Sequence, residues 1–292
     1  MPIIQLNIAL LTGHQYFCMK FPVVYVNYGL FVTCKRLFIR KAAPVKNYRL
    51  SVALIWFMLM CSFPALAQEK ISVAVASNFI SVFKEIALDF EAKTGVKVEA
   101  TFDSTGSLYN QIKSGVPYDM FLSADEQRPD LLQKEGWTEG TFIYARGKVI
   151  LWSVDKNFCK AAKWQDALKN DQIKKIAIAN SLIAPYGAAA KAALQKAGLW
   201  DALQPKLVNT PDIARSFQYA NTSAVDAGFC ALSVTASPQG KRGCFFNIPE
   251  APDIVQTACV AKNAGNKINA ELFAAYLLCD DALKIRKKYG YR

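Results

Sequence analysis

Residues 71–125 constrain the fold most, because apolar strands and amphipathic helices alternate within them. The sequence ISVAVA at 71–76 predicts a buried strand, and the helix after Ser77 repeats apolar residues three and four apart until Gly95. A strand, a short helix, a strand and a helix are expected next, at 96–102, 107–114, 118–123 and 126–135. This alternation predicts parallel strands with helices packed on them.

The two strand-to-helix junctions of this segment, at 76–78 and 103–107, are rich in hydroxyl and small side chains. The first turn of a helix leaves backbone N–H groups unpaired and carries partial positive charge. The carboxyl ends of neighbouring parallel strands lie at one edge of a sheet, so the junctions predict an anion site there. The alternative is that Ser77 and Thr105 serve only as helix N-caps.

A second run of alternating strands and helices begins with a strand predicted at 146–154, which crosses into a second lobe. Thr210-Pro211-Asp212 predicts a helix start with Thr210 as the N-cap. The other elements expected in this lobe are helices 164–169, 188–197 and 212–220, strands 175–179, 206–208 and 225–232, and a loop at 181–187. Those expected to return to the first lobe are strands 244–248 and 255–262 and helices 269–278 and 280–288.

We therefore predict an α/β protein of two lobes joined by a hinge, each lobe a mainly parallel sheet flanked by helices. The chain crosses once into the second lobe and returns once to the first, and these two crossings set the predicted lobe boundaries. Lobe I is predicted to comprise 68–149 and 250–292, and lobe II to comprise 150–249.

The N-terminal part of the chain resembles a leader rather than a piece of the fold. Residues 35–67 combine basic residues, the apolar run Leu50–Phe63 and an A-x-A cleavage motif at 65–67, which together predict export to the periplasm with cleavage near Ala67. We interpret residues 1–34 as an upstream-start extension or a longer leader. A membrane-anchored segment and lipidation of Cys61 are the alternatives.

Charge and histidine content exclude several classes of function. Of the net charge of +12, seven Lys and Arg lie in 1–67, which leaves 28 basic and 23 acidic residues in 68–292. That balance, without a basic and aromatic patch, argues against a nucleic-acid partner. The only histidine is His14, so the folded part cannot form a Ser-His-Asp triad or a histidine zinc site. Asp119 and Asp125 flank a strand, and Asp125 is expected to cap the next helix rather than to act in acid–base catalysis.

Five cysteines remain after the leader. Export permits disulfides, and an odd number leaves at least one thiol free. We expect a bridge between Cys244 and Cys259, and we expect Cys230 and Cys279 in the core; the fifth is Cys159.

Five segments in order resemble the periplasmic molybdate-binding proteins of ABC transporters. They are AVASNF at 74–79, FDSTGSLYNQIKSGVPYDMFLSAD at 102–125, NSLIAPYGAAAKAAL at 180–194, AGFCALS at 227–233 and IRKKYGY at 285–291. The resemblance implies a type II periplasmic-binding-protein fold. It also implies a monomeric receptor without a cofactor, which holds molybdate or tungstate between its lobes and delivers it to a membrane permease with its ATPase.

The resemblance also implies which residues bind the tetrahedral dianion. Ser77 matches the first hydroxyl ligand and Thr105 the second, where serine is common, with Ser104 as the candidate if the register shifts by one. Asp103 departs from the family, because small residues are common at its position.

The remaining ligands implied by the resemblance act mainly through backbone N–H groups, at Tyr186 and Ile213. Ala231 matches a position at which some members carry a tyrosine hydroxyl, and that hydroxyl is absent here. The implied site consists of donors alone, without a metal cation ligand. A site of donors disfavours protonated phosphate, whose proton would lack an acceptor.

Three other functions remain open at this point. The same fold could serve as a receptor for sulfate or another oxyanion, since only cavity size would exclude sulfate. An iron receptor would use clustered tyrosines, and it is disfavoured because Tyr289 and Tyr291, although close in sequence, lie at the chain end. An exported enzyme is disfavoured by the lack of histidine.

Overall fold

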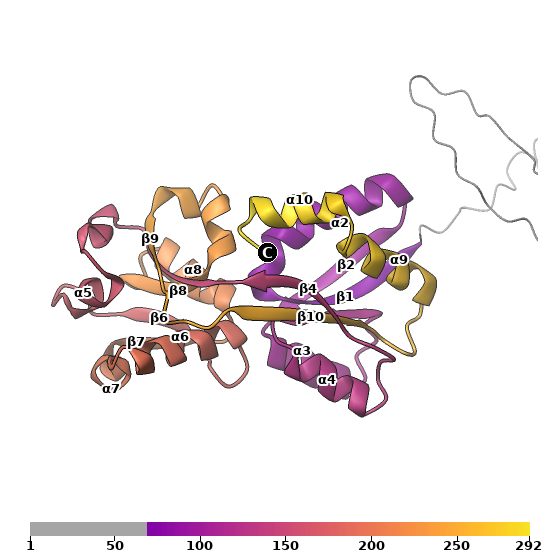
Figure 1. The fold of residues 1–292 in the computed structure, drawn as a ribbon, viewed down its shortest axis with the longest axis horizontal. Coiled ribbons are helices and arrows are strands. Elements are labelled where there is room, and N and C mark those ends of the chain that lie inside the picture. Colours follow the sequence, from indigo (N-terminus) through magenta and orange to yellow (C-terminus); the bar gives the residue numbers. More distant parts are fainter. Residues whose placement is uncertain (1–68) are drawn as a thin grey trace, which may run out of the picture. The chain divides into compact units, whose positions relative to one another are not determined.

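The computed structural model describes residues 69–292, which contain two five-stranded sheets with helices on both faces (Figure 1). The predicted leader, its cleavage site, His14 and Cys61 lie outside the described residues. The strands are β1 (Lys70–Ala76), β2 (Lys97–Asp103), β3 (Met120–Leu122), β4 (Phe142–Gly147), β5 (Val149–Ser153), β6 (Ile176–Ala179), β7 (Leu207–Thr210), β8 (Ala227–Ala231), β9 (Cys244–Asn247) and β10 (Ile254–Val260). The helices are α2 (Ile80–Thr94), α3 (Thr105–Lys113), α4 (Gln127–Lys134), α5 (Trp164–Lys169), α6 (Pro185–Lys196), α7 (Trp200–Leu203), α8 (Ile213–Asn221), α9 (Lys267–Leu277) and α10 (Asp280–Lys288).

The first sheet has the strand order β2-β1-β3-β10-β4. Helices α2, α9 and α10 cover one face and α3 and α4 cover the other (Figure 1). The apolar positions predicted on α2 lie in the core, where Phe83 and Phe90 both pack edge-on against Phe273 of α9. Gly95 ends α2 in the left-handed conformation with φ of 76°, as its position after the helix predicts.

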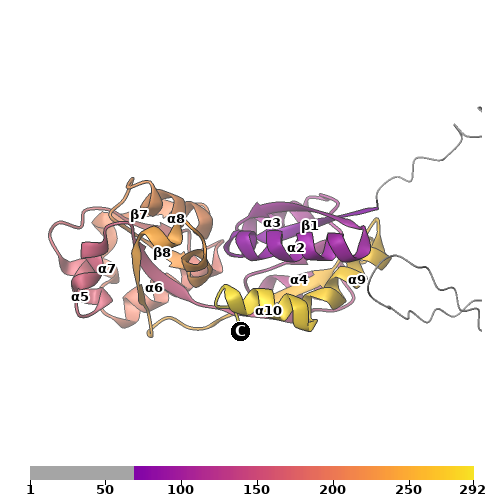
Figure 2. The same ribbon diagram turned by 90° about the horizontal axis from the view of Figure 1, so that it is seen from above.

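The second sheet repeats this pattern with the order β7-β6-β8-β5-β9. Helix α8 covers one face, while α5, α6 and α7 lie on the other, and these helices group around the second sheet in both views (Figures 1 and 2). The small residues of α6, among them Ala189, Ala190 and Ala193, are buried against the sheet. Small side chains let the helix approach the strands closely.

Both sheets are mixed rather than mainly parallel. β1 pairs in parallel with β2 and β3, and β6 with β7 and β8, whereas β10 is antiparallel to β3 and β4, and β5 is antiparallel to β8 and β9. A parallel neighbour needs a crossover connection such as a helix. The antiparallel strands instead carry the chain directly between the sheets, β4 into β5 and β9 into β10.

The prediction of two α/β sheets is therefore confirmed, and the single strand predicted at 146–154 is corrected to the end of β4 followed by β5. The part of β4 before Arg146 is not predicted from the sequence. The exact lobe boundaries predicted at 149/150 and 249/250 concern which parts move together, and they stay a prediction.

The predicted Cys244–Cys259 bridge is wrong. Cys244 is bonded to Cys159, which joins β9 to the turn at 156–160 within the second sheet's layer. Cys259 lies in β10 of the first sheet, so closeness in sequence did not bring it near Cys244. Cys230 and Cys259 are free and buried, and Cys279 is free and half-buried. Within 69–292 no helix is both long and apolar enough to cross a membrane.

Candidate anion-binding site

Strand register brings the predicted site residues to two sheet edges. Ala76 of β1 lies opposite Asp103 of β2, so Ser77 and the Ser104-Thr105 pair follow side by side at the carboxyl edge of the first sheet. In the second sheet Ala179 lies opposite Thr210, and the chain leads from these two residues into α6 and α8. Each sheet therefore presents two helix starts at its carboxyl edge.

Ser77 is buried, at 6% exposure, and it opens a short 3₁₀ turn that leads into α2. Its side chain caps neither that turn nor the helix. Its hydroxyl has no hydrogen-bond partner among the residues that the structure describes. The capping alternative is therefore wrong for Ser77. The enclosed side-chain polar atoms without a partner in the described chain are Thr257 Oγ1 and Arg286 Nε, so the Ser77 hydroxyl stays accessible and free to donate.

Ser104 and Thr105 have separate roles. Ser104 is the N-cap of α3, where its Oγ accepts the N–H of Ser107 at 3.3 Å and donates to Ser107 Oγ at 2.8 Å. Thr105 is the first residue of α3, which begins two residues earlier than predicted, and its Oγ1 accepts the N–H of Ala124 at 3.1 Å. A hydroxyl that accepts a hydrogen bond keeps its own hydrogen for a further acceptor. Thr105 is thus the better placed donor, and Ser104 the cap.

Tyr186 lies in the first turn of α6, because this helix begins at Pro185 and not at 188 as predicted. Proline fits the first helical position, since no N–H bond is needed there. The side chain of Tyr186 is 1% exposed, and no acceptor in the described part of the chain takes its backbone N–H. The predicted loop at 181–187 is correspondingly shorter.

Ile213 is the first residue of α8. The N-cap is Asp212 rather than the predicted Thr210: the Asp212 carboxylate accepts the N–H groups of Ala214 and Arg215 at 2.8 and 3.0 Å. Thr210 instead donates to the Asp212 carbonyl at 2.9 Å. The cap serves the second and third helical residues, and the N–H of Ile213 has no acceptor within 69–292.

The carboxylates near these donors are already engaged. Asp103 accepts the N–H of Ser104 at 2.6 Å and a weaker bond from Gln111 at 3.4 Å. Asp125 accepts the N–H of Arg128 at 3.0 Å and pairs with its guanidinium, although the N-cap position of α4 is held by Glu126 and not by Asp125 as predicted. Asp119 accepts two backbone N–H groups. In the described chain, no group of three His, Cys, Asp or Glu residues could hold a metal ion.

Residues 71–292 match the family of bacterial extracellular solute-binding proteins. This chain is a bacterial extracellular solute-binding protein. It is 39% identical over 249 residues to the molybdate-binding protein ModA of Azotobacter vinelandii, covering 83% of this chain and 96% of that one. It is 38% identical over 237 residues to ModA of Rhodobacter capsulatus, covering 79% and 90%.

A solved structure agrees with this assignment. The periplasmic molybdate-binding protein of A. vinelandii superimposes with a TM-score of 0.72 and 33% identity, over 76% of this chain and 98% of that one. The predicted periplasmic-binding-protein fold and the resemblance to molybdate-binding proteins are confirmed. Proteins of this family bind solutes, so the prediction of a receptor rather than an enzyme is confirmed as well.

The solute-binding protein carries a buried polar network that the sequence analysis missed. Asn78 Nδ2 donates to Gln256 Oε1 at 2.8 Å, Tyr144 Oη donates to the same oxygen at 3.0 Å, and Gln256 Nε2 donates to Tyr186 Oη at 3.1 Å. Burial raises the pKa of Tyr144 and of Tyr186 well above the usual range, so both phenols stay protonated. The signal in the sequence is Gln256, an amide within the mostly apolar strand β10. The Tyr186 side chain, for which the sequence predicts no role, is part of this network.

Ala231 ends β8 and is 1% exposed, and its methyl side chain can neither donate nor accept a hydrogen bond. Two residues later, Ser233 Oγ donates to the carbonyl oxygen of Asn78 at 3.0 Å. The end of β8 therefore lies beside the Ser77–Phe79 turn, although Ala231 itself offers no side-chain donor.

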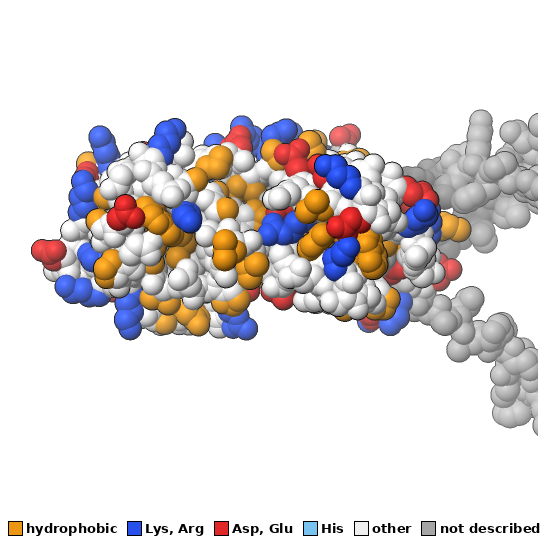
Figure 3. Space-filling view, turned by 90° about the horizontal axis from the view of Figure 1, so that it is seen from below, with side chains coloured by type: hydrophobic (Ala, Val, Ile, Leu, Met, Phe, Trp, Pro, Cys, Tyr) orange, Lys and Arg blue, Asp and Glu red, His pale blue; other side chains and the backbone are white. Residues whose placement is uncertain are grey.

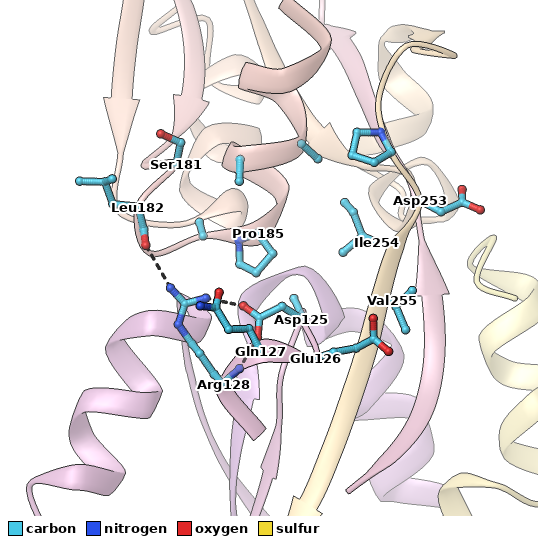
Figure 4. A pocket seen from close by; sticks show the side chains of 15 residues that line it. Asp125, Glu126, Gln127, Arg128, Ser181, Leu182, Pro185, Asp253, Ile254 and Val255 are labelled. Carbon is cyan, nitrogen blue, oxygen red and sulfur yellow. Dashed lines mark hydrogen bonds and ion pairs between the residues drawn. The ribbon is translucent and has the colours of Figure 1, made fainter. Parts of the chain in front are cut away.

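A pocket of about 410 Å³ lies beside the residues that are predicted to bind the anion (Figure 4). Its lining includes Ala124 and Pro185, the neighbours of Thr105 and Tyr186, but none of the six predicted site residues. Across the pocket, the Arg128 guanidinium donates to the Leu182 carbonyl at 3.0 Å (Figure 4). The predicted donors are therefore not part of the wall of this pocket.

Basic side chains are scattered over the face formed by α3, α4 and α6, with acidic side chains between them (Figure 3). An extended basic surface of the kind that binds a nucleic-acid backbone is not visible on this face.

Proposed function

We propose that this protein captures molybdate or tungstate and delivers it to the membrane permease of an ABC transporter, which a cytoplasmic ATPase drives. The observation that carries the proposal is a set of donors on buried residues whose hydrogens find no acceptor in the described chain: the hydroxyls of Ser77 and Thr105 and the N–H groups of Tyr186 and Ile213. Two come from each sheet edge. The two relatives named for molybdate binding support the choice of ligand.

A fully ionised tetrahedral oxyanion suits such donors, because each of its oxygens only accepts hydrogen bonds. The first turns of α3, α6 and α8, which follow the carboxyl edges of the two sheets, carry partial positive charge that favours an anion. Phosphate near neutral pH often keeps a proton, and the nearby carboxylates of Asp103 and Asp125 are engaged elsewhere. An unpaired phosphate proton would cost affinity.

The capture step we propose is closure of two lobes, 68–149 with 250–292 and 150–249, around the oxyanion. Hinge closure around a ligand is a common motion of binding proteins. Contacts between elements of the two sheets support it: the N–H of Gly106 donates to the carbonyl of Ile183 at 2.8 Å, and Arg128 reaches Leu182. The leader would be removed near Ala67, which releases a monomer into the periplasm.

Calorimetry on the chain from Gln68 onward tests this function, since the residues from Ala65 form a compact unit of their own. Molybdate, tungstate, sulfate and phosphate are titrated separately. We expect one-to-one binding of molybdate or tungstate that is at least about 100-fold tighter than that of sulfate. Equal binding of sulfate would make the protein a general oxyanion receptor, and no binding of any of the four would overturn the proposal.

A further inference from the structure

Tyr291, the second-last residue, is buried at 3% exposure although it lies at the chain end. Arg292 pairs with Arg146 of β4 through backbone bonds of 2.7 and 3.1 Å, and its side chain forms an ion pair with Asp253. Gly290 makes the bend after α10 with φ of 79°. The chain end is therefore held along β4, with the tyrosine directed inward.

The phenol of Tyr291 contacts the turn that carries Ser77. Its Oη donates to the carbonyl oxygen of Asn78 at 2.8 Å and accepts from Asn78 Nδ2 at 3.0 Å. Its ring packs edge-on against Phe79, with the ring centres 5.1 Å apart. Tyr291 thus holds the carbonyl oxygen and the side-chain amide of Asn78, and it also packs against the ring of Phe79.

The same phenol reaches the second sheet. Tyr291 Oη lies 3.3 Å from Ser233 Oγ, and Ser233 donates to the Asn78 carbonyl at 3.0 Å. Ser233 follows β8 of the second sheet, whereas Asn78 follows β1 of the first. Separation of the sheets would break the bonds of Ser233 and leave those between Tyr291 and Asn78 intact.

Tyr186 makes a second connection of this kind. Its Oη, from α6, accepts from Gln256 of β10 at 3.1 Å and lies 3.4 Å from Asn78 Nδ2. Gly147 provides the space, since a Cβ there would lie 2.0 Å from the Tyr186 oxygen. The turn at Ser77 is consequently bonded to the second sheet through two phenols and one serine.

We propose that Tyr291 is a positioning residue for the oxyanion: it holds the Ser77–Phe79 turn against Ser233 when the two sheets are together, and so couples ligand retention to closure. The proposal rests on the oxyanion capture proposed above. Tyr291 touches no ligand in this scheme and acts through Asn78, the residue after Ser77. Its loss should therefore speed ligand release more than it destabilises the free protein.

The test compares Tyr291→Phe with Tyr289→Phe in the full mature chain. The first removes one buried oxygen and keeps the ring, and the second removes a phenol that donates to Glu85 at 2.8 Å on the outer side of α2. The measurements are the dissociation rate of molybdate and the melting temperature with and without molybdate. For Tyr291→Phe we expect a dissociation rate raised about 5- to 10-fold and a smaller ligand-induced rise in melting temperature. The melting temperature without molybdate should fall less than the melting temperature with molybdate.

A role limited to anchoring the chain end gives a different result. The melting temperatures of Tyr291→Phe with and without molybdate would then fall by equal amounts, and its dissociation rate would stay at the wild-type value. This result would overturn the proposal. Failure of the wild-type protein to bind any oxyanion would instead remove the function itself, so the two failures are distinguishable.

Ser233→Ala examines the same contact from the second sheet. The effects of Tyr291→Phe and Ser233→Ala on the dissociation rate should be non-additive, because both remove one shared bonding arrangement at the Asn78 carbonyl. The double variant should release molybdate less than about twofold faster than the more affected single variant. Fully multiplicative effects would show that the residues act independently and would contradict the proposed coupling.

Discussion

The N–H of Gly106 donates to the carbonyl oxygen of Ile183 at 2.8 Å, and a Cβ on Gly106 would lie only 2.8 Å from the Cβ of Ile183. Gly106 is the second residue of α3 and Ile183 lies two residues before α6. The contact joins elements of the two sheets directly beside Thr105 and Tyr186. It requires a residue without a side chain.

Gly106→Ala should therefore weaken oxyanion binding by about 10- to 100-fold, because the methyl group holds the loop at Ile183 away. The free protein should not lose stability, since alanine is favoured over glycine inside a helix by about 1 kcal/mol. Calorimetry with molybdate and thermal unfolding without it measure the two effects. Gly140→Ala is the control, because nothing lies within 4 Å of a Cβ there. Unchanged affinity in Gly106→Ala would mean that this contact plays no part in capture.

The hydroxyls of Ser104 and Thr105, at the start of α3, should have different functions. Thr105→Val should reduce molybdate affinity about 10- to 100-fold, whereas Thr105→Ser keeps the donor and should remain within about threefold of wild type. Ser104→Ala removes the N-cap and should cost about 1 kcal/mol of unfolding free energy with little loss of affinity. Calorimetry and urea unfolding of the three variants give both quantities. A larger affinity loss in Ser104→Ala than in Thr105→Val would reverse the assignment.

Ser77→Ala belongs to the same series but removes a hydroxyl that bonds to nothing else in the described chain. Its affinity loss should match that of Thr105→Val, and its unfolding free energy should stay within about 0.5 kcal/mol of wild type.

Periodicity predicted most of this fold because each helix buries one continuous apolar face. The face of α2 and the glycine after it could be recognised from neighbouring residues alone. The Cys159–Cys244 bond could not, because it depends on which sheet each strand joins. For the same reason the polar network around Asn78 escaped prediction: its members come from β4, β10, α6 and the chain end. Local patterns indicate the hydroxyls of the proposed site, whereas the residues that would support them are set by tertiary contacts.

The disulfide should stabilise the protein without affecting the site. Cys159 and Cys244 are 85 residues apart, and a bond closing a loop of that size contributes about 4 kcal/mol by restricting the unfolded chain. Changing both residues to serine should lower the urea midpoint markedly and leave molybdate affinity unchanged, because the bond lies at the edge strand β9. Cys279→Ser, which removes a free thiol, is the control and should have little effect. Equal midpoints for the two variants would contradict the stabilising role.

The buried phenols should make the protein sensitive to alkali. Burial raises the pKa of Tyr144, Tyr186 and Tyr291, so below about pH 10 these phenols are protonated in both the folded and the unfolded chain and contribute no pH dependence. Above that pH the unfolded chain loses their protons while the folded one keeps them. Each phenol then lowers the unfolding free energy by about 1.4 kcal/mol per pH unit until its folded pKa is reached.

A pH jump to alkali, followed by ultraviolet absorbance of the phenolate, measures this effect. Exposed tyrosines should ionise at once, whereas the three buried ones should ionise only at the rate of unfolding seen by circular dichroism. Tyr291→Phe should reduce the slow amplitude by the equivalent of one tyrosine, and bound molybdate should slow the phase in the wild-type protein because the ligand stabilises the folded state. Immediate ionisation of all tyrosines would show that these phenols reach water in the folded protein, in which case the network between the two sheets does not persist in solution.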